Sequence, residues 1–225
     1  MLVNADFSRR ASLTPDQYRW VPSPQPGVER VMLDRLGAEH GHATSLVRYA
    51  PGVHFPLHQH PGGEEVLVLS GTWCEGAQQY PAGTYLRNPP GSSHAPFSSE
   101  GATLFVKLWQ MAPEPGQPLR IDTRDPAAWS LDNAHECCEL YRDAVEHVWL
   151  QRLDAGSRVL PALVPGAELL VLDGALREGE MLYPSGSWLR LPAGEYAGLV
   201  AADTLVTLYL KIGPLGVRSG QGEHR

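Results

Sequence analysis

The sequence contains one order of motifs twice, and this duplication limits what the chain can fold into. Four segments of the first half return in the second half, in the same order and with similar Gly, Pro and apolar positions. The matching pairs are residues 27–36 with 145–153, 61–71 with 165–174, 80–91 with 183–194, and 104–108 with 208–212. Such self-similarity indicates a tandem repeat of one structural unit. We therefore predict two domains, residues 1–118 and residues 119–225, with a linker that begins at the Pro-rich residues 113–118.

Each repeat reads as a series of short strands. Residues 66–69, 103–109 and 205–212 are rich in β-branched and aromatic residues, and clusters of Gly or Pro bound them. The 23 Gly and 20 Pro are spread over many such clusters, as expected for a protein with many tight turns. Apolar residues alternate through residues 206–212, which is the period of a half-buried strand. The pattern predicts an all-β fold of two tandem jelly-roll β-barrels, because two sheets bury each other's apolar faces.

The first repeat carries four residues at a spacing that suits a metal site. His58 and His60 are separated by one residue, so both side chains project from the same face of a strand. Glu64 follows a Pro-Gly-Gly turn and His94 follows a Pro-Pro-Gly turn, so both can reach the same point. Glu65 is also a carboxylate, but strand alternation turns it away if Glu64 faces the metal. Three imidazoles and one carboxylate suit a divalent transition metal and leave one or two coordination positions open.

The second repeat has lost these four residues. Their aligned positions hold small or apolar residues, which in chain order are Ala162, Val164, Ala167 and Ala197. Glu168 survives, but it aligns with Glu65. We therefore expect one divalent metal ion per chain, held by the first domain. We expect the second barrel to serve packing or dimerisation, and a separate ligand pocket within it is the alternative.

The spacing of His58, His60, Glu64 and His94 resembles the two motifs of the cupins, apart from Ser98 where the second motif often has Asn. More narrowly, residues 60–65 (HPGGEE), 87–94 (RNPPGSSH) and 105–109 (FVKLW) resemble the cupin module of the ChrR family of anti-sigma factors. That resemblance implies a small β-barrel with the metal inside, zinc as its metal, and a part in sensing oxidative stress. The sigma-binding portion of that family is a separate helical domain with zinc-binding His and Cys residues. The roughly twenty residues before the first strand pattern have no Cys or His, so the resemblance covers the cupin module alone.

Two functions are compatible with this site, and the sequence does not decide between enzyme and non-enzyme. The first is a regulatory module that senses a small molecule or oxidative stress, with zinc favoured and iron, nickel or manganese as alternatives. The second is an iron-dependent dioxygenase acting on a diketone or hydroxy-ketone, because related cupins with the same four ligands do that chemistry. No general base stands out beyond the ligands, which favours sensing. A four-residue metal site is common to both, and fold does not define function.

The composition excludes several other classes of protein. A net charge of −7 argues against direct nucleic-acid binding, which needs clustered Lys and Arg. No stretch resembles a signal peptide or has the length of a membrane span, so we expect no membrane association. Cys137 and Cys138 are adjacent and disfavour a mutual disulfide, which together with Cys74 predicts free thiols and a cytoplasmic location. The resemblance to cupins also implies a homodimer.

Several other residues are weaker candidates. His40 and His42 form a second His-x-His pair, for which we expect a surface location. His54 is a candidate for the second shell or the pocket. Tyr49, Phe105 and Lys107 are also candidates for pocket residues, on strand position alone. We expect Cys74 to be a small core residue of a strand. Residues 132–144, which include His135 and the two adjacent cysteines, are expected to form one solvated helix.

Overall fold

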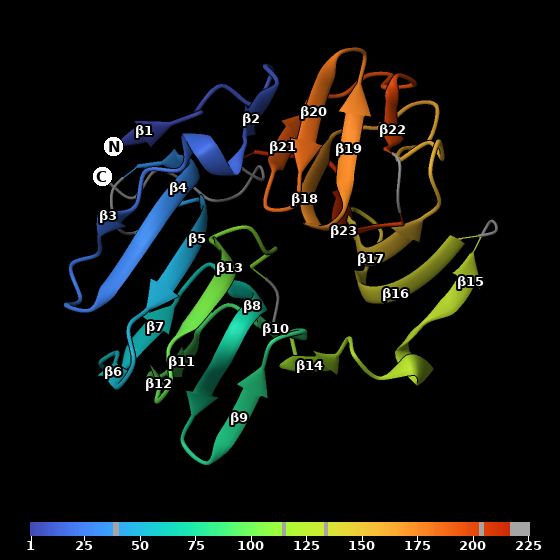
Figure 1. The fold of residues 1–225 in the computed structure, drawn as a ribbon. Helices are drawn as coiled ribbons and strands as arrows, with labels where there is room; N and C mark the ends of the chain where they lie inside the picture. The colour runs from blue at the N-terminus through green and yellow to red at the C-terminus, as the bar shows by residue number, and fades with distance from the viewer. Residues whose placement is uncertain (38–40, 114–115, 133–134, 203–204, 217–225) are drawn as a thin grey trace. The chain divides into compact units, whose positions relative to one another are not determined.

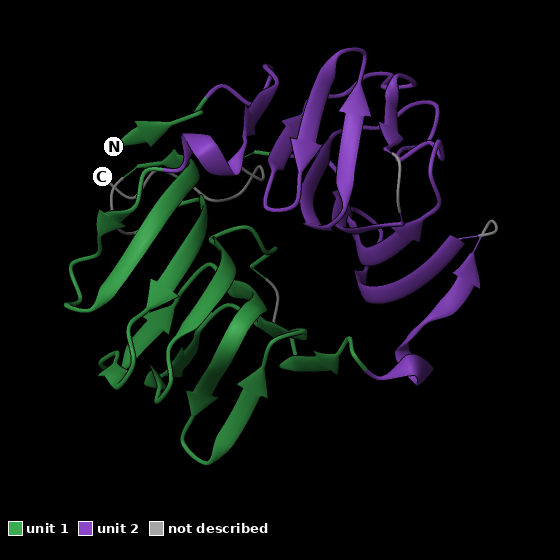
Figure 2. Cartoon of the chain, in the orientation of Figure 1, with its two compact units in different colours: residues 1–5, 19–124, 216–225 green, residues 6–18, 125–215 purple. Residues whose placement is uncertain are grey.

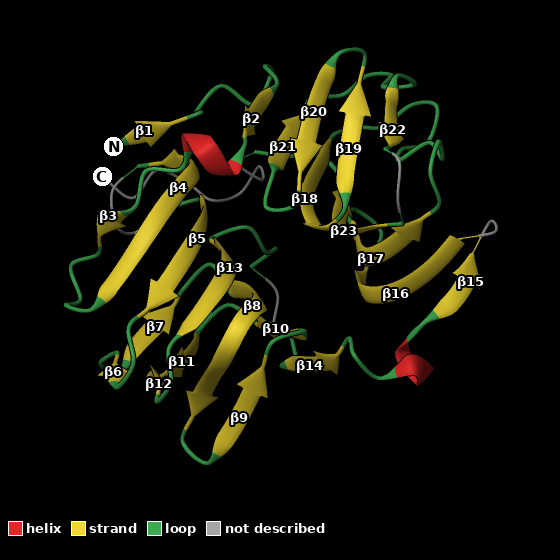
Figure 3. Cartoon of the chain, viewed as in Figure 1, coloured by secondary structure: helices red, strands yellow, loops and turns green. Residues whose placement is uncertain are grey.

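The computed structural model describes residues 1–37, 41–113, 116–132, 135–202 and 205–216. These residues form two compact units (Figure 2), which consist mainly of Arg19–Arg124 and of Asp125–Leu215. Within the described ranges the only helical segments are two short 3-10 turns, η1 (Pro15–Gln17) and η2 (Pro126–Ala128), and all other regular structure is β-strand (Figure 3). No helix in this part of the chain is long and apolar enough to span a bilayer. The prediction of an all-β fold with two tandem barrels is confirmed.

The first unit is built around one large antiparallel sheet in which seven strands follow the order β1-β4-β5-β13-β8-β10-β14 (Figure 1). Strands β3, β6, β9 and β12 extend this sheet, and β7 and β11 form a separate pair. The bounds are β1 (Leu2–Val3), β3 (Val21–Pro22), β4 (Val28–Leu36), β5 (Ala43–Tyr49), β6 (Val53–His54), β7 (His58–His60), β8 (Glu64–Glu75), β9 (Gln78–Pro81), β10 (Thr84–Asn88), β11 (Ser92–His94), β12 (Pro96–Ser98), β13 (Ala102–Leu108) and β14 (Leu119–Asp122).

The second unit repeats this arrangement. Its main sheet has the order β15-β16-β17-β23-β18-β21-β2, and β19, β20 and β22 form a second sheet. The bounds are β2 (Ala11–Leu13), β15 (Ser130–Asp132), β16 (His135–Arg142), β17 (His147–Leu153), β18 (Ala167–Asp173), β19 (Ala175–Glu178), β20 (Met181–Pro184), β21 (Trp188–Leu191), β22 (Leu199–Ala201) and β23 (Val206–Ile212). From β4 to β14, the strand order of the first unit matches the order from β16 to β2 in the second.

This order corrects one of the four sequence pairings. Residues 145–153 contain β17, which lies next to β23 as β5 lies next to β13. They therefore correspond to β5 and not to residues 27–36, which contain β4. Neighbouring strands of one sheet carry similar alternation of apolar residues, so the sequence pattern could not separate β4 from β5.

The leading strand of each repeat completes the sheet of the other repeat. β2 precedes the first repeat in the chain but pairs with β21, with Leu13 opposite Trp188. β14 precedes the second repeat but pairs with β10, with Ile121 opposite Tyr85. Asp6–Tyr18 therefore belongs to the second compact unit, and the first unit extends to Arg124. Domain limits at residues 1–118 and 119–225 stay a prediction about where the two repeats divide.

The segment predicted as a helix over residues 132–144 is a pair of antiparallel strands, and that prediction is wrong. Asp132 of β15 lies opposite His135 of β16, and residues 133–134 lie outside the described ranges. Cys138 and Leu140 are buried and their neighbours are more exposed, which is the period of a strand. The sequence pattern suggested that the charged residues of this segment lie on the solvated face of a helix. In the structure they lie on the more exposed face of a strand.

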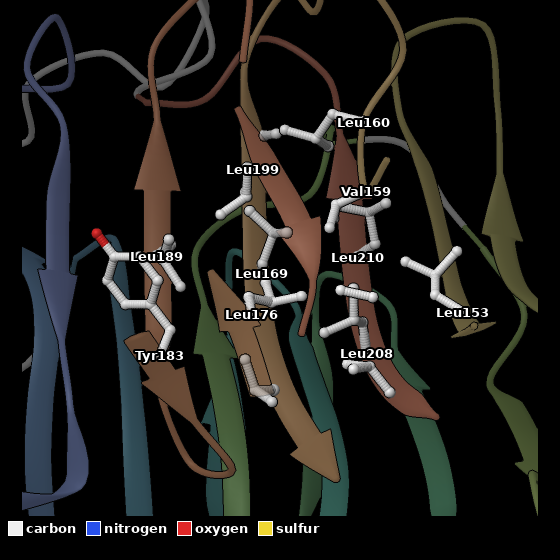
Figure 4. Packing of buried hydrophobic residues seen from close by; sticks show 14 of the residues in the cluster. Leu153, Val159, Leu160, Leu169, Leu176, Tyr183, Leu189, Leu199, Leu208 and Leu210 are labelled. Atoms are coloured by element: carbon white, nitrogen blue, oxygen red, sulfur yellow. The ribbon is translucent and has the colours of Figure 1, made fainter. Parts of the chain in front are cut away.

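The interior of the second unit is a continuous apolar core. Leucines and valines from β18, β21 and β23 pack with residues of the loops before β18 (Figure 4). Leu169, Leu208 and Leu210 are fully buried at its centre. In the first unit the corresponding cluster also contains buried aromatic residues, among them Tyr49 and Trp73. Cys74 is buried in β8 as expected, and all three cysteines are free.

Candidate metal centre

Three of the four predicted site residues lie side by side on the short strands β7 and β11. The strands pair antiparallel, with His94 opposite His58. The turns next to them place Gly63 at a φ of 76° and Gly91 at 83°, a region that Gly adopts without a steric penalty. As a result the centroids of all three imidazole rings, including that of His60, lie 4.7 Å apart in each pair.

The inner nitrogens of these rings face one another. His94 Nε2 lies 2.9 Å from His60 Nε2 and 3.2 Å from His58 Nε2. Glu64 begins β8, is buried, and places its Oε2 3.6 Å from the Nε2 atoms of both His60 and His94. The structure therefore brings all four predicted residues into one cluster, with the three histidines at its centre.

The outer nitrogens set which ring atoms carry protons. His58 Nδ1 donates to the carbonyl of Pro56 at 2.9 Å, because a carbonyl oxygen can only accept. His94 Nδ1 lies 2.6 Å from Glu75 Oε1, which leaves its Nε2 as an acceptor when the ring is neutral. Two lone pairs then face each other across 3.2 Å. A divalent cation that accepts both lone pairs satisfies this arrangement, so the donor set fits a metal ion.

The electrostatics of the cluster agree with its geometry. Burial lowers the pKa of His60, partly opposed by the charge of Glu64. Burial alone would also lower the pKa of His94, but the hydrogen bond to Glu75 and the nearby carboxylates raise it overall. Burial would raise the pKa of Glu75, and the contacts with His94 and Arg120 lower it overall. Glu75 is therefore a carboxylate that holds the ring of His94.

A second layer that sequence reasoning missed supports the cluster. Asn88 Nδ2 donates to Glu64 Oε2 at 2.9 Å, and Arg120 donates to Asn88 Oδ1 at 2.7 Å. Arg120 also reaches Glu75 Oε2 at 3.4 Å. One guanidinium on β14 thus links the supports of Glu64 and His94, which orients both side chains. A signal was present for Glu75, since it recurs in the second repeat as Glu178.

The second unit keeps part of this outer layer without the inner ligands. Arg10 forms an ion pair with Glu178 at 2.5 Å and donates to the hydroxyl of Tyr183 at 3.0 Å. In the first unit Arg120 likewise contacts Glu75 and the hydroxyl of Tyr80. Among the described residues the only His/Cys/Asp/Glu group with metal-binding geometry is that of the three histidines in the first unit.

A mainly apolar cavity of about 360 Å³ lies beside the histidines. His58, His60 and Glu64 form part of its wall. Most of its remaining lining comes from Val28, Val47, Tyr49, Phe55, Trp73, Leu104, Val106 and Leu108. The cavity therefore joins a group of polar donors to an aromatic and aliphatic surface, as small-molecule sites commonly do.

Of the three predicted pocket residues, Tyr49 lines this cavity and is confirmed. The prediction for Phe105 and Lys107 is wrong, because Leu104 and Val106 of the same strand face the cavity. Successive side chains of a strand point to opposite faces, so residues 105 and 107 lie on the other face of the sheet. There Lys107 is buried and donates to Thr44 Oγ1 at 3.2 Å.

The other histidines among the described residues lie outside the cluster. His42 is buried with its Nε2 3.3 Å from Asp34, so the prediction of a surface position is wrong for it. A carboxylate partner permits an imidazole to be buried at this place. His40 lies outside the described residues. His54 is exposed and stacks on Phe97 with ring centroids 4.9 Å apart, and it does not line the cavity.

Solved structures with this architecture are known. The chain is similar to a putative dioxygenase from Nostoc punctiforme with a TM-score of 0.71, at 15% identity over 98% of this chain and 84% of that one. It is also similar to the bacterial pirin YhhW of Escherichia coli in complex with nickel(II), with a TM-score of 0.64, 13% identity and coverage of 92% and 100%. An oxalate decarboxylase matches with a TM-score of 0.63, 13% identity and coverage of 91% and 77%. None of the curated proteins matches the sequence.

These neighbours show that the chain has a cupin-type fold with two tandem units. The model of the ChrR cupin-like domain matches residues 8–112 of the chain. The match spans all four residues of the cluster, from His58 to His94. The resemblance that the motifs indicated is confirmed.

Proposed function

We propose that the first unit binds one divalent metal ion per chain through His58, His60, Glu64 and His94. The observation that carries this proposal is the 3.2 Å distance between His58 Nε2 and His94 Nε2, whose lone pairs face each other. A cation bound to both lone pairs would stabilise this contact. Glu75 and Asn88 hold the ligands from behind, as outer partners do in metal sites. Zinc is the metal we favour, because imidazole nitrogens and carboxylate oxygens are among its usual ligands. Iron, nickel and manganese are the alternatives.

We further propose that the unit is a sensing or regulatory module that reports on a small molecule or on oxidative stress. The match of residues 8–112 to the ChrR cupin-like domain supports this role. The cavity of about 360 Å³ supports a ligand that is mostly apolar and carries an oxygen donor toward the histidines. A bound metal would supply a Lewis acid for that oxygen. Tyr49, Phe55 and Trp73 would bind the apolar part of the ligand and exclude water from it.

A metal-dependent dioxygenase acting on a diketone or hydroxy-ketone is the second candidate. The apolar wall beside the histidines favours it, because a diketone could bind there with its oxygens toward the metal ligands. One of the similar solved structures is titled a putative dioxygenase, and at 15% identity that likeness concerns the fold. Among the residues lining the cavity, none outside the cluster is an Asp, Glu or His that could serve as a separate base.

Metal analysis followed by oxygen uptake separates the two candidates. Protein loaded with zinc or iron is mixed with a small diketone or hydroxy-acetophenone, and oxygen consumption is recorded. A sensing module gives no turnover with either metal, and its metal content or thermal stability changes with ligand or peroxide. Turnover of about 1 per second or more with iron, and none with zinc, would establish the dioxygenase.

We also expect a cytoplasmic homodimer. Three free thiols suit a reducing compartment, and β15 lies at the edge of its sheet with Leu131 exposed. Light scattering at micromolar concentration tests the dimer, and a monomer mass would contradict it.

A further inference from the structure

The second unit has a cavity of its own, and it is larger than the one beside the histidines. Its volume is about 710 Å³, within the range of small-molecule sites. It lies over the faces of β15, β16 and β17 and is also lined by residues 158–161 and Ile212. Its lining includes Cys137, Glu139, Arg142, His147, Trp149, Gln151 and Arg158. None of them belongs to the proposed metal centre, so the inference goes beyond that function.

The second repeat carries different side chains from the first on the strand face that lines this cavity. Gln151 lies opposite Leu208 on the neighbouring strand, where the first unit has Val47 opposite Leu104. In the same way Trp149 and His147 occupy the positions of Ser45 and Ala43. Smaller side chains of β5 in the first unit are thus replaced by aromatic and polar side chains of β17 in the second.

Two residues of the cavity, Gln151 and the exposed Arg158, have hydrogen-bond donors without an acceptor in the described part of the chain. Gln151 is only 8% exposed, and its Oε1 accepts from Trp149 Nε1 at 3.3 Å. Its Nε2 has no hydrogen-bond partner among the described residues. The guanidinium of Arg158 also has no ion pair or hydrogen bond within the described part of the chain, and it lines the same space. An occupant with several acceptor atoms would satisfy these groups.

The nearest acidic group on β16 does not serve that purpose. Glu139 Oε2 is bound by Arg142 Nε at 2.8 Å and lies 3.3 Å from His147 Nε2. Arg142 also donates to His147 Nε2 at 2.9 Å, so the proton of a neutral His147 ring is on Nδ1. Burial of His147, together with the charge of Arg142, lowers its pKa. The carboxylate of Glu139 is therefore already paired. Asp132, the other carboxylate that lines the cavity, forms no ion pair with Arg158, so the exposed guanidinium of Arg158 can pair with an anion.

The remaining lining is aromatic and aliphatic. The rings of His147 and Trp149 are stacked, with centroids 4.0 Å apart and an interplanar angle of 25°. Val159 and Leu160 add buried apolar surface next to them. A flat ring can pack against such a surface while a charged group at its edge reaches the donors.

We propose that this cavity binds a small aromatic carboxylic acid. The ring of the ligand packs on the His147–Trp149 pair, and its carboxylate pairs with Arg158 and accepts from Gln151 Nε2. A carboxylate suits these donors because guanidinium and amide N–H groups bind its two oxygens together. The second barrel then has a ligand site in place of the metal centre that its repeat has lost.

The test uses calorimetric titration of the full chain with benzoate, salicylate and phenylacetate, and with benzamide as the uncharged counterpart. We expect at least one acid to bind with a Kd of about 1 mM or tighter, and benzamide to bind at least about tenfold more weakly. Arg158→Gln should weaken binding of that acid by at least about tenfold. Arg177→Gln is the matched control, because Arg177 is an exposed arginine of β19 that does not line the cavity.

Binding at the first unit is separated by repeating the titration with chelated His58→Ala protein, in which the proposed metal centre is disabled. Retention of binding supports the site in the second unit. Absence of binding by all three acids, equal affinity for benzamide, or loss of binding in the His58→Ala protein would overturn the proposal. Equal affinity of the Arg158→Gln and Arg177→Gln proteins would overturn it as well. Failure of the metal proposal leaves these outcomes unchanged, because no metal takes part.

Discussion

The two units share one strand order, yet they differ at the four positions where the first unit holds its candidate metal ligands. In the first unit three histidines and Glu64 meet beside a cavity of about 360 Å³. In the second unit Val164 and Ala167 occupy two of the aligned positions and belong to a continuous apolar core. The outer arginine, glutamate and tyrosine persist in both units, as Arg120 with Glu75 and as Arg10 with Glu178. The strand order therefore does not depend on the ligands.

The comparison teaches which interactions hold each barrel together. Imidazole and carboxylate lone pairs that converge in an interior require a cation or a proton between them, because unpaired polar groups cost free energy when buried. Apolar residues at the same places need no such partner and contribute through burial and packing. We expect the first unit to depend on its metal and the second unit to be stable without one.

The largest expected effect is on metal content. His94→Ala should reduce the bound metal from one ion per chain to nearly none, because it removes a ligand and the partner of Glu75. The matched change in the second unit is Ala197→His, which should add no second ion because Ala162, Val164 and Ala167 cannot coordinate. Elemental analysis after gel filtration measures both. Full metal content in the His94→Ala protein would show that the assigned ligands are wrong.

Chelation should destabilise one unit and leave the other unchanged. A metal at about 1,000 times its Kd contributes about 4 kcal/mol to the free energy of unfolding, and removal of the metal loses that contribution. Hydrogen exchange should therefore speed up in β8 of the first unit and stay constant in the equivalent β18. Equal loss of protection in both strands would show that the units unfold together.

Replacing equivalent leucines of the two units by alanine should lower the free energy of unfolding by different amounts. Leu208 and Leu104 occupy matching positions, and both are buried. Leu208→Ala should lower stability by about 3–5 kcal/mol, because Leu208 is fully buried in the apolar cluster, does not line the cavity of its unit, and would leave a new void. Leu104→Ala should cost about 2 kcal/mol, because one side of Leu104 already faces the cavity of the first unit. Denaturant unfolding of metal-free protein measures both values, and a larger loss for Leu104→Ala would contradict this account of the two interiors.

The smallest effect should come from the outer arginines. Arg120→Leu should weaken metal affinity by about tenfold, since Glu75 and Asn88 lose the group that orients them. Arg10→Leu removes the equivalent arginine of the second unit and should leave metal affinity unchanged. Competition with a chromophoric chelator gives the two affinities. Identical affinities for the two variants would mean that Arg120 does not position the ligands.

The duplication, the β class and the four residues of the cluster could be predicted from the sequence alone. Their signals are local, because turn residues, alternation and the spacing of His58, His60, Glu64 and His94 all lie within one or two strands. The loss of the ligands in the second repeat was readable for the same reason. Where alternation was applied without a known register, as for Phe105 and Lys107, it selected the wrong face of the strand.

Only the tertiary structure decided how distant segments complete each barrel. β2 pairs with β21 and β14 with β10, and the choice between these partners is made by sheet pairing between segments that are far apart in the sequence. The same pairing brings Arg120 to the outer layer of the metal centre, and no spacing in the sequence predicts it. The cavity of the second unit likewise depends on side chains from β15, β16, β17, β23 and the loop of residues 158–161. Turn residues and strand alternation act over a few residues, so the sequence shows them directly. Pairing between distant strands decides which side chains come into contact, and only the tertiary structure shows it.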